Sequence, residues 1–204
     1  MLFLQMVNLQ KEGPNRETLT LVSEALVFIW AGLVYLLRKP LSRLIKVIRN
    51  ESLRFVAVGY FSTVVAETVY MFSKPIHQVW IIDIVLTAPW YVLWMFLWYG
   101  VLKKYEFTLW QAFLLGGFHG FVVEGVLTGI IFNPILALLS LPLLTALYGS
   151  FFIVPYLLMK EDFKNQQPVS PRRRFWVSLS PLLAYIPGAI WILVLVVAFG
   201  LKLH

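Results

Sequence analysis

The sequence predicts an all-α integral membrane protein, a bundle of six transmembrane helices with a short amphipathic surface helix after the first. Of the 204 residues, 60% are hydrophobic and only 13% are charged, whereas soluble domains are nearer half apolar and a quarter charged. The apolar residues form six runs, each near the ~20 residues that a helix needs to cross ~30 Å of hydrocarbon. The net charge of +7 is concentrated between these runs, which is typical of membrane proteins rather than of proteins that bind nucleic acid.

The six predicted spans follow one another with short connections, so we expect one polytopic domain over residues 1–204. Basic residues or proline end most spans, as at Arg38, Lys74 and Lys103, and Asn133-Pro134 ends the fourth. The spans are residues 18–37, 55–73, 79–102, 109–131, 135–159 and 175–201. Prolines within the fifth and sixth spans predict interrupted helices, which line sites in some transporters but are also simply common in membrane helices.

The segment between the first two spans has the pattern of a helix that lies on a membrane surface. Apolar residues recur at helical spacing, with basic residues on the other face. The apolar positions are Leu41, Leu44, Ile45 and Ile48, and the basic positions are Arg43, Lys46 and Arg49. We expect this helix to lie on the anionic cytoplasmic leaflet; the alternative is an ordinary basic loop.

The distribution of basic residues predicts the orientation in the cell membrane. Of the 17 Lys and Arg residues, all but Lys11, Arg16, Lys74 and Lys202 fall on one side of the predicted spans. Because short cytoplasmic loops carry the excess of basic residues, we expect a multi-pass protein with both termini outside and its basic loops in the cytoplasm.

Four predicted spans each carry a carboxylate, although a charge in hydrocarbon is costly by about 3 kcal/mol. The four residues are Glu24, Glu67, Asp83 and Glu124. With the orientation above, all four lie roughly 6–10 Å below the outer boundary, at 1.5 Å of rise per residue. This predicts a shared acidic layer. The alternative is that each acid bonds a neighbouring helix separately, and Glu24, near the N-terminus, is the first candidate for such a bystander.

The fourth span combines glycines with polar residues. One row at intervals of four consists of Gly116, Gly120, Glu124 and Thr128, and a second small-residue pair consists of Gly125 and Gly129. Such spacing lets another helix approach closely, or leaves room for a ligand beside the acid. His119 lies on a different side of the helix from Glu124, so it is also expected to serve as a hydrogen-bonding residue toward another helix.

The third span presents a carboxylate, a hydroxyl and several indoles on one face: Asp83, Thr87, Trp90, Trp94 and Trp98. If Trp90 and Trp94 face inward, they form a wall that can hold a flat or cationic ligand; the alternative is that they face lipid. We interpret Trp98, near the end of the span, as a residue of the interfacial belt. On the second span, Tyr60 shares a side with Glu67 and is expected to orient it.

Metal binding is not indicated by the sequence. The histidines are His77, His119 and His204, no H-E-x-x-H motif is present, and there is no cysteine. We therefore expect no metal and no other cofactor.

Two families resemble parts of this chain. Residues Gly117 to Gly125 resemble the helix of emopamil-binding-type sterol isomerases that carries a histidine followed by Glu-Gly, with a His-to-Glu spacing one residue longer here. Those enzymes protonate and deprotonate a hydrocarbon skeleton inside the membrane. Six small spans with short loops are also similar to the substrate-binding membrane subunits of vitamin importers. We transfer no residue roles from either family.

The sequence thus predicts an intramembrane acid–base enzyme that acts on a lipid or isoprenoid. The alternatives are a proton- or cation-coupled small-molecule transporter or substrate-binding membrane component, and a non-catalytic subunit of a membrane complex. The expected catalytic residues are Glu124, Asp83, Glu67 and His119, and the expected substrate-binding residues are Trp90, Trp94, Thr87, Tyr60, Gly120 and Thr128. The expected partners are membrane lipid and an apolar small molecule, without nucleic acid. The sequence does not indicate the oligomeric state, although helix packing through Gly116, Gly120, Gly125 and Gly129 is one route to an assembly.

Overall fold

The structure is a computed structural model that describes residues 14–70, 80–127 and 129–199, apart from the side chains of residues 14–21, 70, 80, 82, 83, 127, 196 and 199. These residues are almost entirely helical, and in this part of the chain the β contacts amount to one isolated bridge between Tyr105 and Gln167. The prediction of an all-α protein is confirmed.

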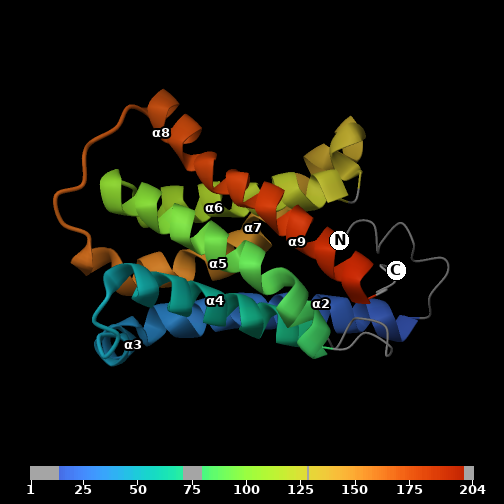
Figure 1. The fold of residues 1–204 in the computed structure, drawn as a ribbon, viewed down its shortest axis with the longest axis horizontal. Helices are drawn as coiled ribbons and strands as arrows, with labels where there is room; N and C mark the ends of the chain where they lie inside the picture. Colours follow the sequence, from blue (N-terminus) through green and yellow to red (C-terminus); the bar gives the residue numbers. More distant parts are fainter. Residues whose placement is uncertain (1–13, 71–79, 128, 200–204) are drawn as a thin grey trace.

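Long helices run back and forth along one axis (Figure 1), and within the described residues each predicted span overlaps one of them or, for the sixth, a composite of three elements. They are α2 (Pro14–Leu36), α4 (Glu51–Tyr70), α5 (Trp80–Lys104), α6 (Leu109–Leu127), α7 (Pro134–Met159) and a composite of α8 (Pro171–Ser178), η5 (Ser180–Ala184) and α9 (Tyr185–Phe199). The shorter elements are α3 (Arg38–Ile45), η3 (Ile130–Phe132) and η4 (Lys160–Asp162).

Three of these helical stretches are long and apolar enough to cross a membrane, namely residues 84–104, 134–162 and 171–195. A fourth is added if Val22–Leu36 and the following α3, bent by 80°, form one span. Within the residues described, α4 and α6 do not belong to this set, and both carry charged or polar residues such as Glu67, His119 and Glu124. Three or four apolar helices agree with a membrane protein, while the presence of six membrane-spanning helices stays a prediction.

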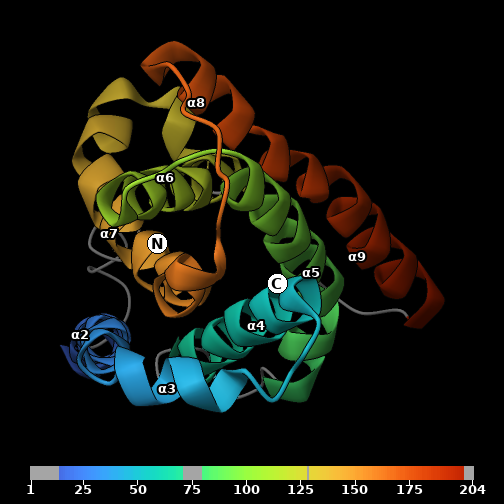
Figure 2. The ribbon, with the colours of Figure 1, turned by 90° about the vertical axis from the view of Figure 1, so that its left-hand side faces the viewer.

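Helices α5 and α7 organise the bundle. Helix α7 packs against α2, α4 and α6, whereas α5 packs against α4 and α9. Viewed from the end that carries α3, α2 and α9 lie on opposite sides of the molecule (Figure 2). The segments 37–50, 105–108 and 160–170 all lie at that end, so the predicted basic loops are brought together (Figure 1).

Glycines allow α6 and α7 to approach each other closely. A Cβ atom at Gly117 would overlap the carbonyl of Thr145, and one at Gly149 would stand 2.8 Å from the carbonyl oxygen of Phe113. Gly116 faces the Cβ of Phe152. The predicted small-residue face of α6 is therefore covered by α7 of the same chain.

The second glycine pair has a different role. Gly125 faces the side chain of Ile131 in η3, and Gly129 adopts a left-handed conformation (φ 74°) that begins the turn out of α6. Asn133 then caps α7 by accepting hydrogen bonds from the backbone N–H groups of Ile135 and Leu136. This agrees with the helix boundary that Asn133-Pro134 predicts.

The predicted interruption of the fifth span is wrong: Pro142 and Pro155 lie inside the continuous helix α7, because a proline removes one backbone hydrogen bond without necessarily ending a helix. The sixth span and α5 respond to proline differently. The predicted break at Pro181 appears as the 3₁₀ segment η5 between α8 and α9. Within α5, Pro89 has no N–H to donate to the carbonyl of Val85. That carbonyl instead accepts a hydrogen bond from Trp191 Nε1 at 3.3 Å, which ties α9 to α5.

Trp98 corrects one interpretation of the sequence. It was expected in the interfacial belt, but its side chain is 1% exposed and lies between Phe107 and His119. The loop that follows α5 and the helix α6 fold over this end of the helix, so a tryptophan near a helix end is enclosed by protein.

Candidate functional site

The fourth predicted span supplies one half of a carboxylate–phenol cluster. The ring of Tyr148 on α7 lies against Gly120, where a Cβ atom would overlap the ring. One turn further along α6, the Tyr148 hydroxyl donates a hydrogen bond to Oε1 of Glu124. The missing side chain at Gly120 thus makes room for the phenol that reaches the acid in the same row.

The second and third predicted spans supply the other half. The Tyr91 hydroxyl on α5 donates a hydrogen bond to Oε1 of Glu67 on α4 at 3.2 Å. Electrostatic interactions connect the Tyr148 hydroxyl with Tyr91 and Glu67 as well as with Glu124. We call Glu67, Tyr91, Glu124 and Tyr148 the carboxylate–phenol cluster; α4, α5, α6 and α7 each contribute one member.

The parts of the four helices that surround the cluster contain no basic residue, since Arg54 and Lys103 lie at the other end of α4 and α5. Residues 55–69, 84–102, 109–126 and 134–159 contain neither lysine nor arginine. Phenol hydroxyls are therefore the donors shown at these carboxylates. A phenol and a carboxyl group can each hold or pass a proton, so the arrangement suits proton transfer.

Stacked aromatic rings border the cluster. The Trp90 ring stacks on Tyr91 (centroids 5.7 Å apart) and on Trp94 (5.8 Å), and Tyr185 of α9 meets Trp90 edge-on at 5.2 Å. Both tryptophans are buried, so they face the protein interior and not lipid. Gly188 lets α9 lie directly on Trp90, since a Cβ atom there would stand 2.8 Å from the Trp90 Cβ.

His119 lies among the tryptophans, beside the cluster's aromatic border. Its side chain is 1% exposed, and Nδ1 accepts a hydrogen bond from Trp94 Nε1 at 3.2 Å. This bond assigns the proton of a neutral ring to Nε2. The backbone of Ser178 faces the imidazole, but no acceptor meets hydrogen-bonding geometry at Nε2 among the residues described. His119 therefore connects α6 with α5 through its hydrogen bond to Trp94.

The remaining expected site residues are placed as follows. Thr87 lies one turn before Tyr91 on α5 and is partly buried, and Tyr60 packs against the hydrophobic core from α4. The phenol shown at Glu67 is Tyr91, whereas Tyr60 was expected to orient that acid. Thr128 and the side chain of Asp83 lie outside the described residues.

Glu24 belongs to the same half of the bundle as the cluster. Ser23, its neighbour, donates a hydrogen bond to the Val69 carbonyl of α4 at 3.0 Å, two residues beyond Glu67. Glu24 is partly buried on α2. The expected common level of Glu24 and Glu67 agrees with this contact.

The phenols of the cluster were not expected from the sequence. Tyr148 lies past the middle of α7, which runs from the predicted outer side inward, but helical side chains point toward the helix N-terminus. Its hydroxyl consequently reaches the level of Glu124. The glycine row indicated a close helix or a ligand beside Glu124; the identity of the neighbouring residue depends on helix pairing.

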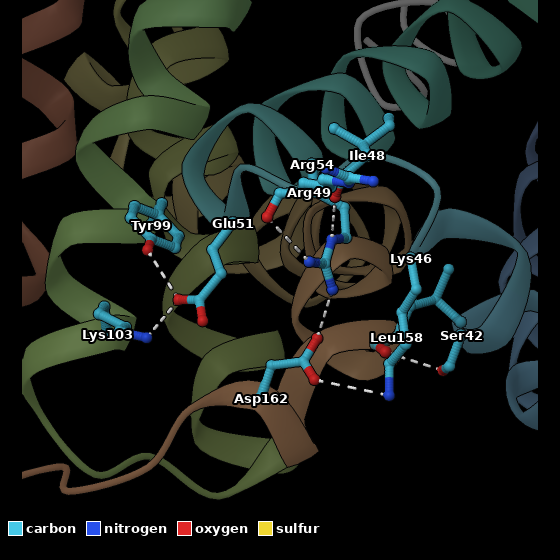
Figure 3. A network of polar contacts seen from close by, with 10 residues as sticks. All are labelled: Ser42, Lys46, Ile48, Arg49, Glu51, Arg54, Tyr99, Lys103, Leu158 and Asp162. Atoms are coloured by element: carbon cyan, nitrogen blue, oxygen red, sulfur yellow. Dashed lines mark hydrogen bonds and ion pairs between the residues drawn. The ribbon is translucent and has the colours of Figure 1, made fainter.

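A second polar network lies at the opposite end of the bundle (Figure 3). The Arg54 side chain is only 8% exposed, and its Nη1 stands 2.8 Å from Oδ2 of Asp162. Arg54 Nε also donates to the carbonyl of Ile48 at 2.9 Å, and Lys46 Nζ lies 3.8 Å from Asp162. These contacts hold the ends of α3, α4 and α7 together.

Glu51 forms a neighbouring, more exposed pair at this end. Its Oε2 accepts hydrogen bonds from Lys103 Nζ and from the Tyr99 hydroxyl (Figure 3). The hydrogen bond from the Lys103 ammonium is the largest cause that lowers the pKa of Glu51 below its usual 4.5, while partial burial acts in the opposite direction. This carboxylate is charged at neutral pH.

Among the described residues no group of three or more His, Cys, Asp or Glu side chains is arranged to hold a metal ion. No protein-family model, curated protein or solved structure matches this chain. The interpretation of the carboxylate–phenol cluster as a functional site therefore depends on its geometry alone.

Proposed function

We propose that this protein is an intramembrane acid–base enzyme that acts on a lipid or isoprenoid, with six helices spanning the membrane. The basic end, which contains Arg54 and Lys103, faces the cytoplasm and both termini face outside. The observation that carries the proposal is the carboxylate–phenol cluster, in which Glu124 pairs with Tyr148 and Glu67 pairs with Tyr91. Two carboxyl groups within electrostatic reach of one phenol provide a proton donor and a proton acceptor.

The proposed reaction moves a carbon–carbon double bond. Glu124, in its protonated form, donates its proton to one alkene carbon, which forms a C–H bond and leaves positive charge on the adjacent carbon. Glu67 then removes a proton from the next carbon, and the C–H electrons form the new double bond. The protons gained and lost by the substrate balance, and Tyr148 and Tyr91 return the proton between the two carboxyl groups.

The aromatic border suits the intermediate. Trp90 and Trp94 present π systems of the kind that stabilises a carbocation in an apolar surrounding. Asp83, on the same helix as Tyr91, is a second candidate for the proton acceptor. His119, Thr87, Tyr60, Gly120 and Thr128 remain candidates for shaping the substrate site.

Deuterium incorporation tests the proposal even when the substrate has not been identified. The full chain is reconstituted in vesicles made in D₂O that contain a total membrane lipid extract, a polyprenol or a sterol, and lipids are analysed by mass spectrometry. We expect the wild-type protein to introduce deuterium into an alkene lipid and Glu124→Gln to reduce this at least about 100-fold, the lower end of the range for a general acid. Glu24→Gln is the matched control. Equal incorporation by wild type and Glu124→Gln would contradict the proposal.

The alternative is a proton- or cation-coupled transporter, which one observation favours. The sixth span is interrupted by η5, and Tyr185 immediately after it interacts electrostatically with Glu124. Interrupted helices line binding sites in transporters. In sealed vesicles with an internal pH-sensitive dye, a transporter would move protons in response to an imposed gradient and lose this in Glu124→Gln, whereas the enzyme would give deuterated lipid without proton flux.

A further inference from the structure

Helix α3 carries a feature that the carboxylate–phenol cluster does not use. It leaves the direction of α2 at 80° and has no buried residue. If α2 lies along the membrane normal, α3 lies close to the membrane plane. It also begins the most basic part of the chain, since residues 38–50 contain five Lys or Arg residues and no Asp or Glu.

One side of α3 is fastened to the bundle. Leu41 and Ile45 pack against the hydrophobic core, and the Ser42 hydroxyl donates a hydrogen bond to the Leu158 carbonyl at the end of α7, at 2.7 Å (Figure 3). The ion pair of Lys46 with Asp162 adds a contact just beyond the helix. These contacts determine which side of α3 faces away from the protein.

The other side combines exposed apolar and basic residues. Leu44 is 69% exposed and Val47 is 81% exposed, and Arg43 and Lys39 beside them are exposed as well. The sequence pattern placed Leu44 with Leu41 and Ile45 on a single apolar face. The structure divides that group, because Leu41 and Ile45 contact the protein while Leu44 and Val47 turn outward.

We propose that the outward face of α3 and of the turn that follows it, formed by Lys39, Arg43, Leu44 and Val47, is a binding site for anionic phospholipids. Leu44 and Val47 enter the boundary between headgroups and acyl chains, and Lys39 and Arg43 contact headgroup phosphates. Exposed apolar residues flanked by cations are what an interfacial helix requires, and a segment without a single acid complements a negatively charged leaflet. This inference requires membrane insertion and is independent of the reaction at the cluster.

The depth of α3 provides the first test. Because the chain has no cysteine, Val47→Cys gives one site for a nitroxide label, and Lys164→Cys gives a matched exposed site beyond η4. The full chain is reconstituted in vesicles of equal parts phosphatidylcholine and phosphatidylglycerol. We expect the label at 47 to collide mainly with lipid-soluble oxygen and the label at 164 mainly with a water-soluble nickel chelate. The proposal is wrong if the label at 47 collides with the nickel chelate as often as the label at 164 does. It is also wrong if a protein partner or a second copy shields the label at 47 from both reagents.

The lipid charge provides the second test. The phosphatidylglycerol fraction is varied in nanodiscs, and the label at 47 reports the fraction that gives half-maximal insertion. We expect Lys39→Gln and Arg43→Gln each to raise this fraction by about fivefold, the effect of one basic residue near an anionic surface. Lys164→Gln and Arg172→Gln are controls elsewhere on the same end. An equal effect of the controls, or insertion that does not depend on phosphatidylglycerol, overturns the assignment of the site to α3.

Discussion

The two polar regions of this molecule pair their carboxylates with different donors. At the basic end, Asp162 and Glu51 face the cations of Arg54 and Lys103. In the carboxylate–phenol cluster, Glu124 and Glu67 face the hydroxyls of tyrosines. A neighbouring cation favours the charged form of a carboxylate. A phenol hydroxyl can donate a hydrogen bond to a carboxylate but brings no positive charge to balance it.

This difference separates contributions to stability from contributions to chemistry. The Arg54–Asp162 pair joins segments 108 residues apart and lies where solvent still reaches Asp162, which is 20% exposed. The cluster joins four helices within apolar segments that contain no lysine or arginine. We expect the first region to hold the helices together and the second to exchange protons, and the following variants test this division.

Asp162→Asn should have the largest effect on folding. It leaves the nearly buried guanidinium of Arg54 without its carboxylate, which we expect to lower the free energy of unfolding by about 2–4 kcal/mol. Lys103→Gln breaks the exposed pair with Glu51 and should cost less than about 1 kcal/mol. Unfolding in detergent micelles, followed by circular dichroism, measures both. Similar losses for the two variants would show that burial does not distinguish the pairs.

Gly117→Ala should come next. The new methyl group meets the Thr145 carbonyl, which is backbone and cannot rotate away, so overpacking should lower the free energy of unfolding by about 1–3 kcal/mol. Gly100→Ala is the matched control, since a Cβ atom there has no neighbour within 4 Å, and it should stabilise α5 by up to about 1 kcal/mol. The same unfolding measurement applies; a stabilising Gly117→Ala would mean that α6 and α7 are not in close contact.

The hydrogen bond between Tyr148 and Glu124 should make the effects of mutating the two residues non-additive in a double-mutant cycle. Tyr148→Phe and Glu124→Gln each remove one partner, and the double variant should differ from their sum by about 0.5–3 kcal/mol in the free energy of unfolding. The pair Tyr148→Phe and Glu24→Gln should be additive within about 0.5 kcal/mol. Additivity of the first pair would argue against the cluster.

The smallest expected effect is the pH dependence from Glu51. Because its pKa is lowered in the folded protein, its contribution is present above the usual value of 4.5 and is lost as the pH falls through the lowered folded value. The group is largely exposed, so we expect less than about 1 kcal/mol. Wild type and Glu51→Gln should therefore converge in unfolding free energy once the pH has fallen below the lowered folded pKa of Glu51; a difference that persists at still lower pH would assign the effect to another group.

Local patterns predicted the helices because apolar length, proline and capping residues act within one segment. Asn133-Pro134 begins α7 as expected, and Pro181 lies in the interruption before α9. The segment after the first span is helical as expected. The exposure of single side chains was harder, since Trp98 is enclosed by Phe107 and His119, which come from later parts of the chain.

Only the features of the candidate site that lie within a single helix could be predicted from the sequence. The row of Gly120 and Glu124 lies within α6, so the sequence indicated a closely packed helix or a ligand there. That this neighbour is Tyr148, or that Tyr91 reaches Glu67, depends on how α4 to α7 pair in space. Pairing between helices is a property of the whole bundle and leaves no mark in the periodicity of any one of them.

The bond from Trp191 to the Val85 carbonyl has a consequence for biosynthesis. The two residues are 106 positions apart, so α5 is synthesised well before α9. Until α9 is made, the Val85 carbonyl lacks a hydrogen-bond donor, because Pro89 has no N–H. If α5 crosses the membrane as proposed, this unsatisfied backbone group in hydrocarbon costs several kcal/mol. If both helices cross the membrane as proposed, we expect the stable integration of α5 to depend on the later arrival of α9.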